Sequence, residues 1–197
     1  MLSTNALGRY AITMTAKPIM PVEFTAGMDE AHAKMVGYIR TGISARPSSR
    51  PIMPKTKFKI YIAVQKGDPV DFSKYRHTGI WCVPEDGSSH YYYHVKGLTG
   101  EFIFERRKNF DPTASRTFAK RVKVGTTRHS LTPSELAIQM ESVPVANNDP
   151  EFNCQQWVDY ALRALCHANY LTAEQYSAGL NEMLDAAMEA KDESSAY

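Results

Sequence analysis

Cysteine and histidine are the residue types in this chain that could support covalent catalysis, and three of them lie at informative positions. Cys154 lies in the stretch NCQQWV, where a loop turns into a helix; His77 opens HTGIWCV, and His94 lies near the end of YYYHV. A thiol attacks a carbonyl as its thiolate, and a thiol with an ordinary pKa of about 8.5 needs a base within reach. One cysteine and two histidines could therefore carry out acyl transfer through a thioester.

The local sequence predicts that Cys154 occupies the first turn of a helix. Asn153 is a favourable N-cap, and Gln156 lies at the spacing of a capping box. Apolar residues follow at helical spacing and are expected to form one buried stripe: Trp157, Val158, Ala161, Leu162 and Leu165. The positive end of a helix favours a thiolate, and the free amides of Cys154 and Gln155 could hold an oxyanion. The alternative is that Cys154 is simply the first core residue, because free cysteines are often buried.

The two histidines are predicted to meet. HTGIWCV and HYYYHV form a hairpin around an Asp-Gly loop, so His77 and His94 fall near each other at its open end, whereas His90 lies near the tip. One imidazole could take the thiol proton while the other orients it, and Gly79 would let a substrate approach the strand. Taken singly, each histidine is better explained as a half-buried strand residue with a satisfied ring. A zinc ion held by His77, His94 and Cys154 is a further alternative, but local metal-ligand spacing is missing, and we expect no metal and no cofactor.

The order HTGIW, YYYHV, NCQQWV resembles the lecithin–retinol acyltransferase-like group of circularly permuted papain-like cysteine enzymes, to which bacterial cell-wall cysteine peptidases are related. The likeness covers roughly residues 58 to 166 and rests on three short motifs: His77, Gly79 and Ile80; His94; and Asn153, Cys154, Trp157 and Val158. It implies that Cys154 is the nucleophile, His77 the general base and His94 the group that orients the base. The chain departs from the acyltransferases by having NCQQW in place of NCEHF and a longer hairpin between the histidines.

These residues need a sheet and a helix to bring them together, and the sequence predicts both. Strands are expected at 58–64, 77–83, 90–95, 101–106 and 120–125, with a hairpin loop at 84–89. Helices are expected at 132–140, 153–167 and 172–190, the first capped by Thr132 or Ser134. Strands followed by helices predict an α+β fold with an antiparallel sheet and flanking helices, and the resemblance implies a circularly permuted papain-like arrangement.

The catalytic α+β domain is expected to span residues 58–191. Residues 1–57 are predicted to precede it as an arm that contains a strand at 10–14, a short helix at 29–40 and a basic, Pro-containing segment at 44–55. Residues 192–197 are expected to form an acidic tail.

Positive charge is concentrated in one part of the chain. Residues 31–67 hold eight Lys or Arg and no Asp or Glu, although the net charge of the whole chain is only +2. Such a stretch is usually a solvated surface, but it could also attract phosphates or anionic lipid. We expect substrate contacts from Lys55, Lys57, Lys59 and Trp157, and a coenzyme A thioester or an aminoacyl-tRNA would be a suitable donor for the basic segment.

The composition limits the class of protein. A chain of 197 residues with 43% apolar and 11% aromatic residues suits one globular domain. No apolar run reaches membrane-spanning length, no secretory signal is visible, and three cysteines without a CxxC pair favour a reducing compartment, so a cytoplasmic location is expected.

We expect a cysteine-dependent enzyme acting on a small-molecule or peptide acyl substrate, either a hydrolase (peptidase, amidase or thioesterase) or an amide-forming acyltransferase. The rival is a non-catalytic module whose basic segment 34–66 contacts nucleic acid or membrane; the oligomeric state stays open.

Overall fold

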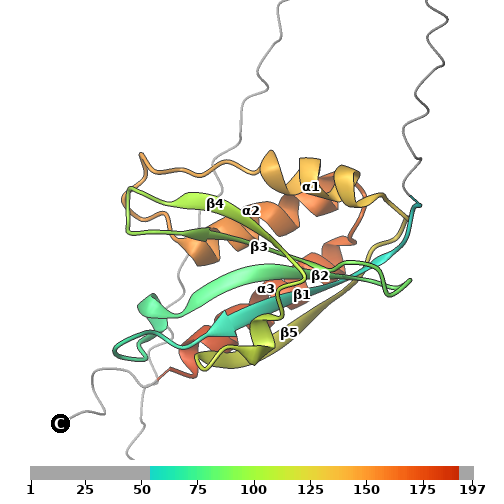
Figure 1. Cartoon of the computed structure of the whole chain (residues 1–197). Helices are drawn as coiled ribbons and strands as arrows, with labels where there is room; N and C mark the ends of the chain where they lie inside the picture. Colours follow the sequence, from blue (N-terminus) through green and yellow to red (C-terminus); the bar gives the residue numbers. More distant parts are fainter. Residues whose placement is uncertain (1–53, 191–197) are drawn as a thin grey trace, which may run out of the picture. The chain divides into compact units, whose positions relative to one another are not determined.

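The computed structural model describes residues 54–190, which form a five-stranded antiparallel sheet and three α-helices (Figure 1). The strands are β1 Phe58–Gln65, β2 His77–Pro84, β3 Tyr91–Lys96, β4 Ile103–Lys108 and β5 Phe118–Thr126. The α-helices are α1 Pro133–Glu141, α2 Cys154–His167 and α3 Ala173–Met188, and the short 3-10 helices are η1 Ser73–Tyr75 and η2 Pro112–Ala114. The strand order is β4-β3-β2-β1-β5, so the connection from β4 to β5 must run from one edge of the sheet to the other.

The predicted α+β class, with an antiparallel sheet and flanking helices, is confirmed. β4 begins later than predicted, because the segment before it is a turn: Gly97 and Gly100 have φ values of 125° and 84°, and the Glu101 amide donates to the Leu98 carbonyl at 2.9 Å. Positive φ at both positions favours glycine. The predicted strand at 10–14, the helix at 29–40, most of the basic segment 44–55 and the tail 192–197 lie outside the described residues.

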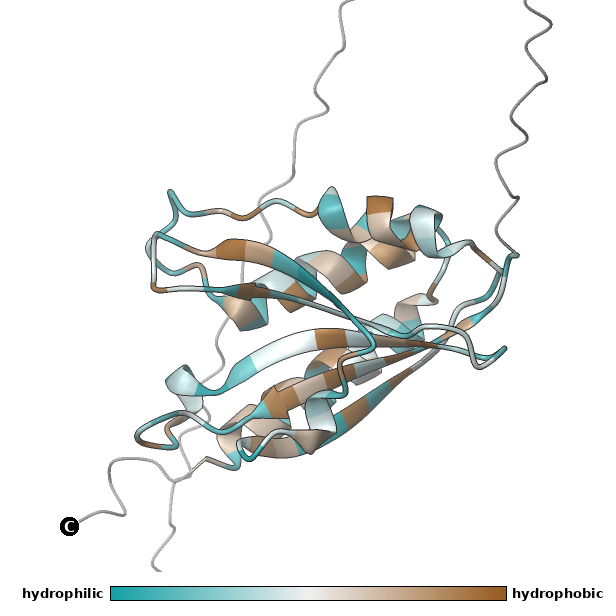
Figure 2. Ribbon diagram, in the orientation of Figure 1, coloured by the Kyte–Doolittle hydropathy of each residue, from teal (hydrophilic) through white to brown (hydrophobic). Residues whose placement is uncertain are grey.

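The main core lies between one face of the sheet and the helices. β1 alternates, with Phe58, Ile60, Ile62 and Val64 fully buried on the helix side. α2 packs on β2 and β3, and α3 packs on β5 and β1. The predicted stripe of α2 is buried throughout, from Trp157 to Leu165. Figure 2 shows brown, apolar ribbon on both the strands and the helices of this layer. Burial of each large apolar side chain here contributes about 1.5–3 kcal/mol before entropy is counted.

The opposite face of the sheet, which we call the open face, carries a smaller apolar cluster. Ala63, Trp81 and Tyr92 are buried there, and Phe110 of the β4–β5 connection packs on the Tyr92 ring at 5.5 Å between centroids. The Trp81 indole N–H donates to His90 Nδ1 at 3.0 Å. His90 is therefore used structurally beside Trp81, near the hairpin between β2 and β3.

Side-chain caps fix the starts of the three helices. Thr132 caps α1 and Thr172 caps α3, each in a complete capping box. Asn153 caps α2 by accepting from the amides of Gln155 and Gln156, both at 3.0 Å. The predicted capping box of α2 is wrong, because Gln156 does not return a bond to the cap and its Oε1 is buried without a partner among the described residues. Within residues 54–190, no helix is both long and apolar enough to cross a bilayer.

Candidate active site

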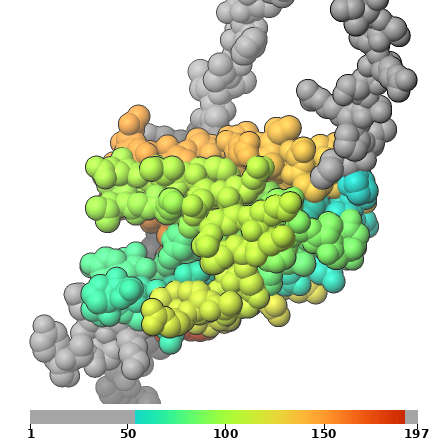
Figure 3. Space-filling view, viewed as in Figure 1, coloured from blue at the N-terminus to red at the C-terminus, as the bar shows by residue number. Residues whose placement is uncertain are grey.

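The candidate site lies where β2 and β3 separate. Their backbone pairing covers only three residue pairs and stops at Ile80 opposite Tyr93, so the start of β2 and the end of β3 are not paired with each other. The start of β2, which holds His77, pairs only with β1, and the end of β3, which holds His94, pairs only with β4. The two strands diverge in Figure 1 towards the end of the sheet that holds η1 and the β3–β4 turn. Figure 3 shows a notch in the surface between these two segments.

The two histidines are in contact and lead to a carboxylate. His77 Nε2 lies 2.9 Å from His94 Nδ1, and His94 Nε2 lies 2.9 Å from Glu105 Oε2. The other oxygen of Glu105 accepts from Lys96 Nζ at 2.7 Å. Hydrogen bonds from Lys96 and His94 lower the pKa of Glu105, so its carboxylate is ionised and can only accept. The juxtaposition of His77 and His94 predicted from the hairpin is present, and Glu105 extends it to three groups.

Ionised Glu105 determines the tautomers of both rings. Because the carboxylate accepts, a neutral His94 carries its proton on Nε2 and leaves Nδ1 with a lone pair. That lone pair accepts from His77 Nε2–H, since the two nitrogens are 2.9 Å apart. A neutral His77 is then left with its lone pair on Nδ1. The basic atom of this group of residues is therefore His77 Nδ1.

Cys154 lies at the start of α2, half-buried and beside the residues that flank His77. Its thiol donates to the Arg76 carbonyl oxygen, with an Sγ to O distance of 3.7 Å. Burial raises the pKa of Cys154, and the nearby Thr78 amide only partly opposes it. Burial and the adjacent His94 lower the pKa of His77 to about 4. The helix end was expected to favour a thiolate, but burial prevails, and at neutral pH the resting site holds an uncharged thiol and an uncharged imidazole.

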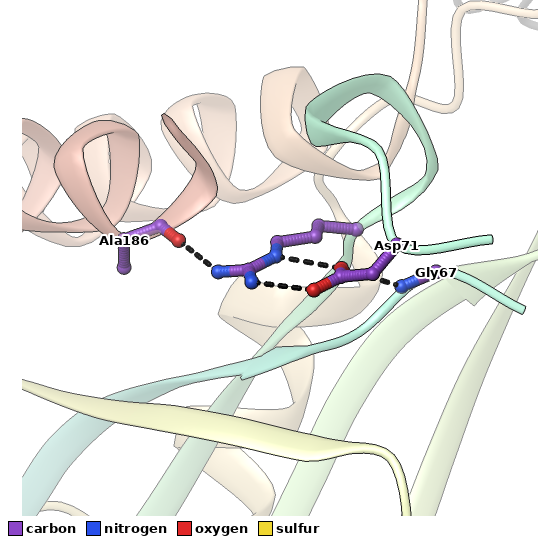
Figure 4. A network of polar contacts seen from close by, with 4 residues as sticks. Gly67, Asp71 and Ala186 are labelled. Atoms are coloured by element: carbon purple, nitrogen blue, oxygen red, sulfur yellow. Dashed lines mark hydrogen bonds and ion pairs between the residues drawn. The ribbon is translucent and has the colours of Figure 1, made fainter. Parts of the chain in front are cut away.

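The buried side chain of Arg76 fixes the backbone carbonyl to which the Cys154 thiol donates. The Arg76 side chain is 5% exposed and makes two bonds to Asp71, from Nε at 2.9 Å and from Nη2 at 2.7 Å. Its Nη1 donates to the Ala186 carbonyl of α3, and Asp71 also accepts from the Gly67 amide at 3.1 Å (Figure 4). The Arg76 carbonyl oxygen accepts from the Cys154 thiol and, at 3.4 Å, from the Gln155 side chain. Arg76 therefore ties the start of β2 to both α2 and α3, and is a positioning residue.

Only one of the two predicted oxyanion amides is free to act. The Gln155 amide donates to the Asn153 side chain at 3.0 Å, and the Gln155 side chain donates to the Ser73 carbonyl at 3.1 Å. Gln155 is thus a structural link between α2 and η1. Among the described residues, no acceptor takes the Cys154 amide. The Cys154 N–H points out of the first turn, as unsatisfied helix-start amides do, and remains a candidate donor.

Tyr92 is a candidate that the sequence did not reveal. Its ring lies 4.8 Å from the His94 ring, and its buried hydroxyl has no partner among the described residues. Burial raises the pKa of Tyr92, and the Cys154 thiol is near enough to add to the effect. Any side chain at Gly79 would collide with the Tyr92 hydroxyl. The space over Gly79, where the sequence predicted that a substrate could approach, is therefore filled by the Tyr92 hydroxyl, a donor without a partner among the described residues.

The residues expected to contact substrate do not gather at this site. Trp157 is fully buried and packs on Phe104 at 5.7 Å between centroids, so its side chain is core. Lys59 pairs with Val83 and Gln65 with His77, so Lys59 lies about 20 Å from His77 along the strands at about 3.3 Å per residue. Lys55 and Lys57 lie further in the same direction, and Lys55 pairs with Glu135 at 2.8 Å. Among residues 54–190, no three Cys, His, Asp or Glu side chains are arranged to hold a metal ion.

Comparison with known proteins identifies the family but not an activity. A model described as a family of unknown function, DUF6540, matches residues 60–172, more than half of the chain, and the chain belongs to this family. The matched region includes His77, His94, Glu105 and Cys154. The searches among curated proteins and among solved structures each found no significant match.

Proposed function

We propose that this protein is a cysteine-dependent acyl-transfer enzyme with a circularly permuted papain-like arrangement. The observation that carries the proposal is the chain of contacts from His77 through His94 to Glu105, together with Cys154 at the start of α2, whose thiol contacts Arg76, the residue before His77. A nucleophile, a base and two successive orienting groups are what covalent acyl catalysis requires. His77 Nδ1, the basic nitrogen at the end of this chain of contacts, has no hydrogen-bond partner among the described residues, so it is available to take a proton.

In the proposed reaction, Cys154 Sγ attacks the carbonyl carbon of an ester, amide or thioester. His77 Nδ1 takes the thiol proton as the C–S bond forms, and His94 with Glu105 stabilises the imidazolium. The Cys154 amide and the Tyr92 hydroxyl donate to the oxyanion of the tetrahedral intermediate. His77 then returns the proton to the leaving group, and a thioester remains on Cys154.

A second nucleophile completes the cycle. Water attacking the thioester makes the protein a hydrolase, and an amine makes it an amide-forming transferase; His77 serves as base in either case. The rival function, a non-catalytic binding module, uses the same fold without covalent chemistry. Intact-mass spectrometry after incubation with p-nitrophenyl acetate distinguishes the two. Acetylation at Cys154 supports the enzyme, whereas a chain that stays unmodified, or is modified only at the half-buried Cys166, supports the module.

Because His77 is the proposed base, the rate of acylation should fall at acidic pH. His77 has a pKa of about 4, below its ordinary value, because of burial and His94. Protonated His77 cannot accept the thiol proton, so the rate should be maintained at pH 6 and fall as pH drops through about 4. The same lowered pKa means that the unfolded chain binds the proton more readily, so stability also falls as pH drops from about 6.5 towards 4. Single-turnover acylation and circular dichroism at each pH separate the two effects. A rate that falls already near pH 7 would contradict a resting site with an uncharged Cys154 thiol and an uncharged His77 imidazole.

Tyr92→Phe should slow acylation by about 100-fold, because losing one donor to an oxyanion has this size of effect. Folding should change little, since the hydroxyl has no partner within residues 54–190. Tyr93→Phe is the matched control: this neighbour also has a buried hydroxyl without a partner among the described residues, but it faces the helix-side core. Equal rates for Tyr92→Phe and the unmodified protein would remove Tyr92 from the site.

The remote lysines bear on the choice of donor. With Lys59 about 20 Å from His77, a small donor such as acetyl phosphate, whose phosphate adjoins the acyl group, has no cations from this set beside it when it reaches the thiol. A triple Lys55, Lys57 and Lys59 to Gln variant should therefore acylate Cys154 from acetyl phosphate at an unchanged rate. Its salt dependence should also match that of the unmodified protein. A severalfold loss would restore the expectation that these lysines bind the donor, and a tRNA long enough to reach them would then be the donor to test.

A further inference from the structure

The open face of the sheet carries a cluster of cations away from the candidate site. Lys57 and Lys59 lie on or just before β1, and Arg121 and Lys123 lie on the neighbouring β5. Backbone pairing sets Tyr61 opposite Lys123 and Ala63 opposite Arg121, so the cations surround Tyr61. All four are exposed. We call this set, Lys57, Lys59, Arg121 and Lys123, the β1/β5 cationic patch.

The charge of this patch is not neutralised within residues 54–190. None of its four members forms an ion pair there, whereas Lys55 and Lys120 pair with Glu135 and Glu189 at 2.8 Å and 2.7 Å. The Thr113 hydroxyl chiefly lowers the pKa of Asp111, and Arg121 contributes only a little and forms no ion pair with this residue. The Asp111 carboxylate accepts instead from the Thr113 amide and hydroxyl, at 2.8 Å and 2.7 Å. Several unpaired cations on one flat surface create a positive potential that attracts anions.

Aromatic rings are interleaved with these cations. Tyr61 is half-buried in the middle of the patch, and its ring lies 5.7 Å from that of Trp81. The Arg121 guanidinium lies 5.1 Å from the Tyr61 ring centroid, in cation–π geometry. Cations that track a phosphate backbone, with aromatic or guanidinium planes on which bases stack, are the features that bind single-stranded nucleic acid without strong sequence preference.

We propose that the β1/β5 cationic patch binds single-stranded nucleic acid. Phosphates lie on Lys59, Arg121 and Lys123, and a base lies against Tyr61 and the Arg121 plane. Lipid is the less suitable partner, because stable membrane binding by such a surface would need exposed apolar side chains within it. Among residues 54–190, the large apolar side chains that are exposed all lie outside the patch: Val70, Tyr75, Leu98, Ile103, Ile138, Leu184 and Met188. Lys59 lies about 20 Å from His77 along the strands, and Arg121 and Lys123 lie on β5, two strands away from β2. No member of the patch has a role in the proposed acyl chemistry, so the inference does not depend on it.

Fluorescence anisotropy of the full chain with labelled oligouridine tests this inference. Binding should weaken roughly twentyfold between about 50 mM and about 200 mM salt, as expected when about three phosphates are neutralised on a single strand. Lys59→Gln with Lys123→Gln should remove most of the affinity and flatten the salt slope. Lys55→Gln with Lys120→Gln is the matched control, because it removes the same charge from ion-paired lysines and should leave the affinity nearly unchanged. Tyr61→Leu should lower the affinity at least about fivefold at constant charge, because a base loses its stacking partner.

Four outcomes would overturn the proposal. Oligouridine that does not bind at about 50 mM salt removes it directly. Equal losses in the two double variants would mean that binding follows net charge and not the patch. An unchanged affinity in a folded Tyr61→Leu variant, checked by thermal denaturation, would reduce the surface to a general polyanion site. Binding to phosphatidylserine vesicles without binding to oligouridine would assign the patch to a membrane instead.

Discussion

Replacing Cys154 by Ala should abolish acylation by p-nitrophenyl acetate and leave the fold intact. The thiol is the proposed nucleophile, and no other cysteine is arranged beside the histidines: Cys82 lies on β2 and is fully buried in the main core, and Cys166 is near the far end of α2. The substitution removes one sulfur whose contact to Arg76 is a weak thiol hydrogen bond at 3.7 Å, so the loss of stability should be about 1 kcal/mol. Intact mass and a thermal melt measure the two parts of this prediction.

Two further variants make the Cys154 result decisive. Cys154→Ser should keep the packing and also be nearly inactive, because a hydroxyl beside an imidazole is a far weaker nucleophile than a thiol. Cys166→Ala changes another half-buried cysteine of the same helix and should acylate normally. Full acylation of the Cys154→Ala chain would end the proposal, because no other residue in it is assigned the covalent bond.

The three central site residues were accessible from the sequence, whereas their supporting residues were not. Cys154, His77 and His94 stand out because a helix start and the open end of a hairpin can be recognised from local patterns. Glu105 lies within a predicted strand, but its role depends on which residue faces it. Pairing of β3 with β4 sets Glu105 opposite His94, and no local pattern determines that register.

Tyr92 was hidden for a similar reason. Three consecutive tyrosines on β3 look alike in sequence, but alternation sends Tyr92 to the open face beside His94 and sends Tyr93 into the helix-side core. The Tyr92 hydroxyl fills the space over Gly79, on the part of β2 that is not paired with β3. Where that pairing stops is a tertiary property, which no local pattern determines.

The three lysines expected to contact substrate lie far from His77 for a geometric reason. Lys55 and Lys57 precede β1 and Lys59 is its second residue, and antiparallel pairing places the start of β1 beside the end of β2, away from His77. The position of these lysines relative to His77 therefore depends on strand pairing, which no local pattern determines. Pairing of β1 with β5 likewise places Lys123 opposite Tyr61 and Arg121 opposite Ala63, two and four residues along β1 from Lys59, although they are about 60 residues later in the chain.

His77→Ala should reduce the acylation rate by about 1000-fold or more, within the range for loss of a general base. Its Nδ1 is the basic nitrogen left unused by the chain of contacts, and alanine offers no proton acceptor. His94→Asn should cost less, about 100-fold, because the asparagine carbonyl can still accept from His77 Nε2–H while the link to Glu105 is lost. Single-turnover acylation at pH 7 measures both rates.

His90→Ala is the control for this ordering, since His90 is engaged with Trp81 at 3.0 Å. It should lose some stability and little rate.

Glu105→Gln adds a test of the tautomer argument, because a neutral amide can donate to His94 Nε2. This donation favours the reversed tautomer of His94, in which its Nδ1–H donates to His77 Nε2. The proton on His77 then moves to Nδ1, and the basic nitrogen is lost. The variant should therefore lose rate although its size and position are unchanged. If His94→Asn and Glu105→Gln acylate as fast as the unmodified protein while His77→Ala does not, the base acts alone and the two orienting groups are structural.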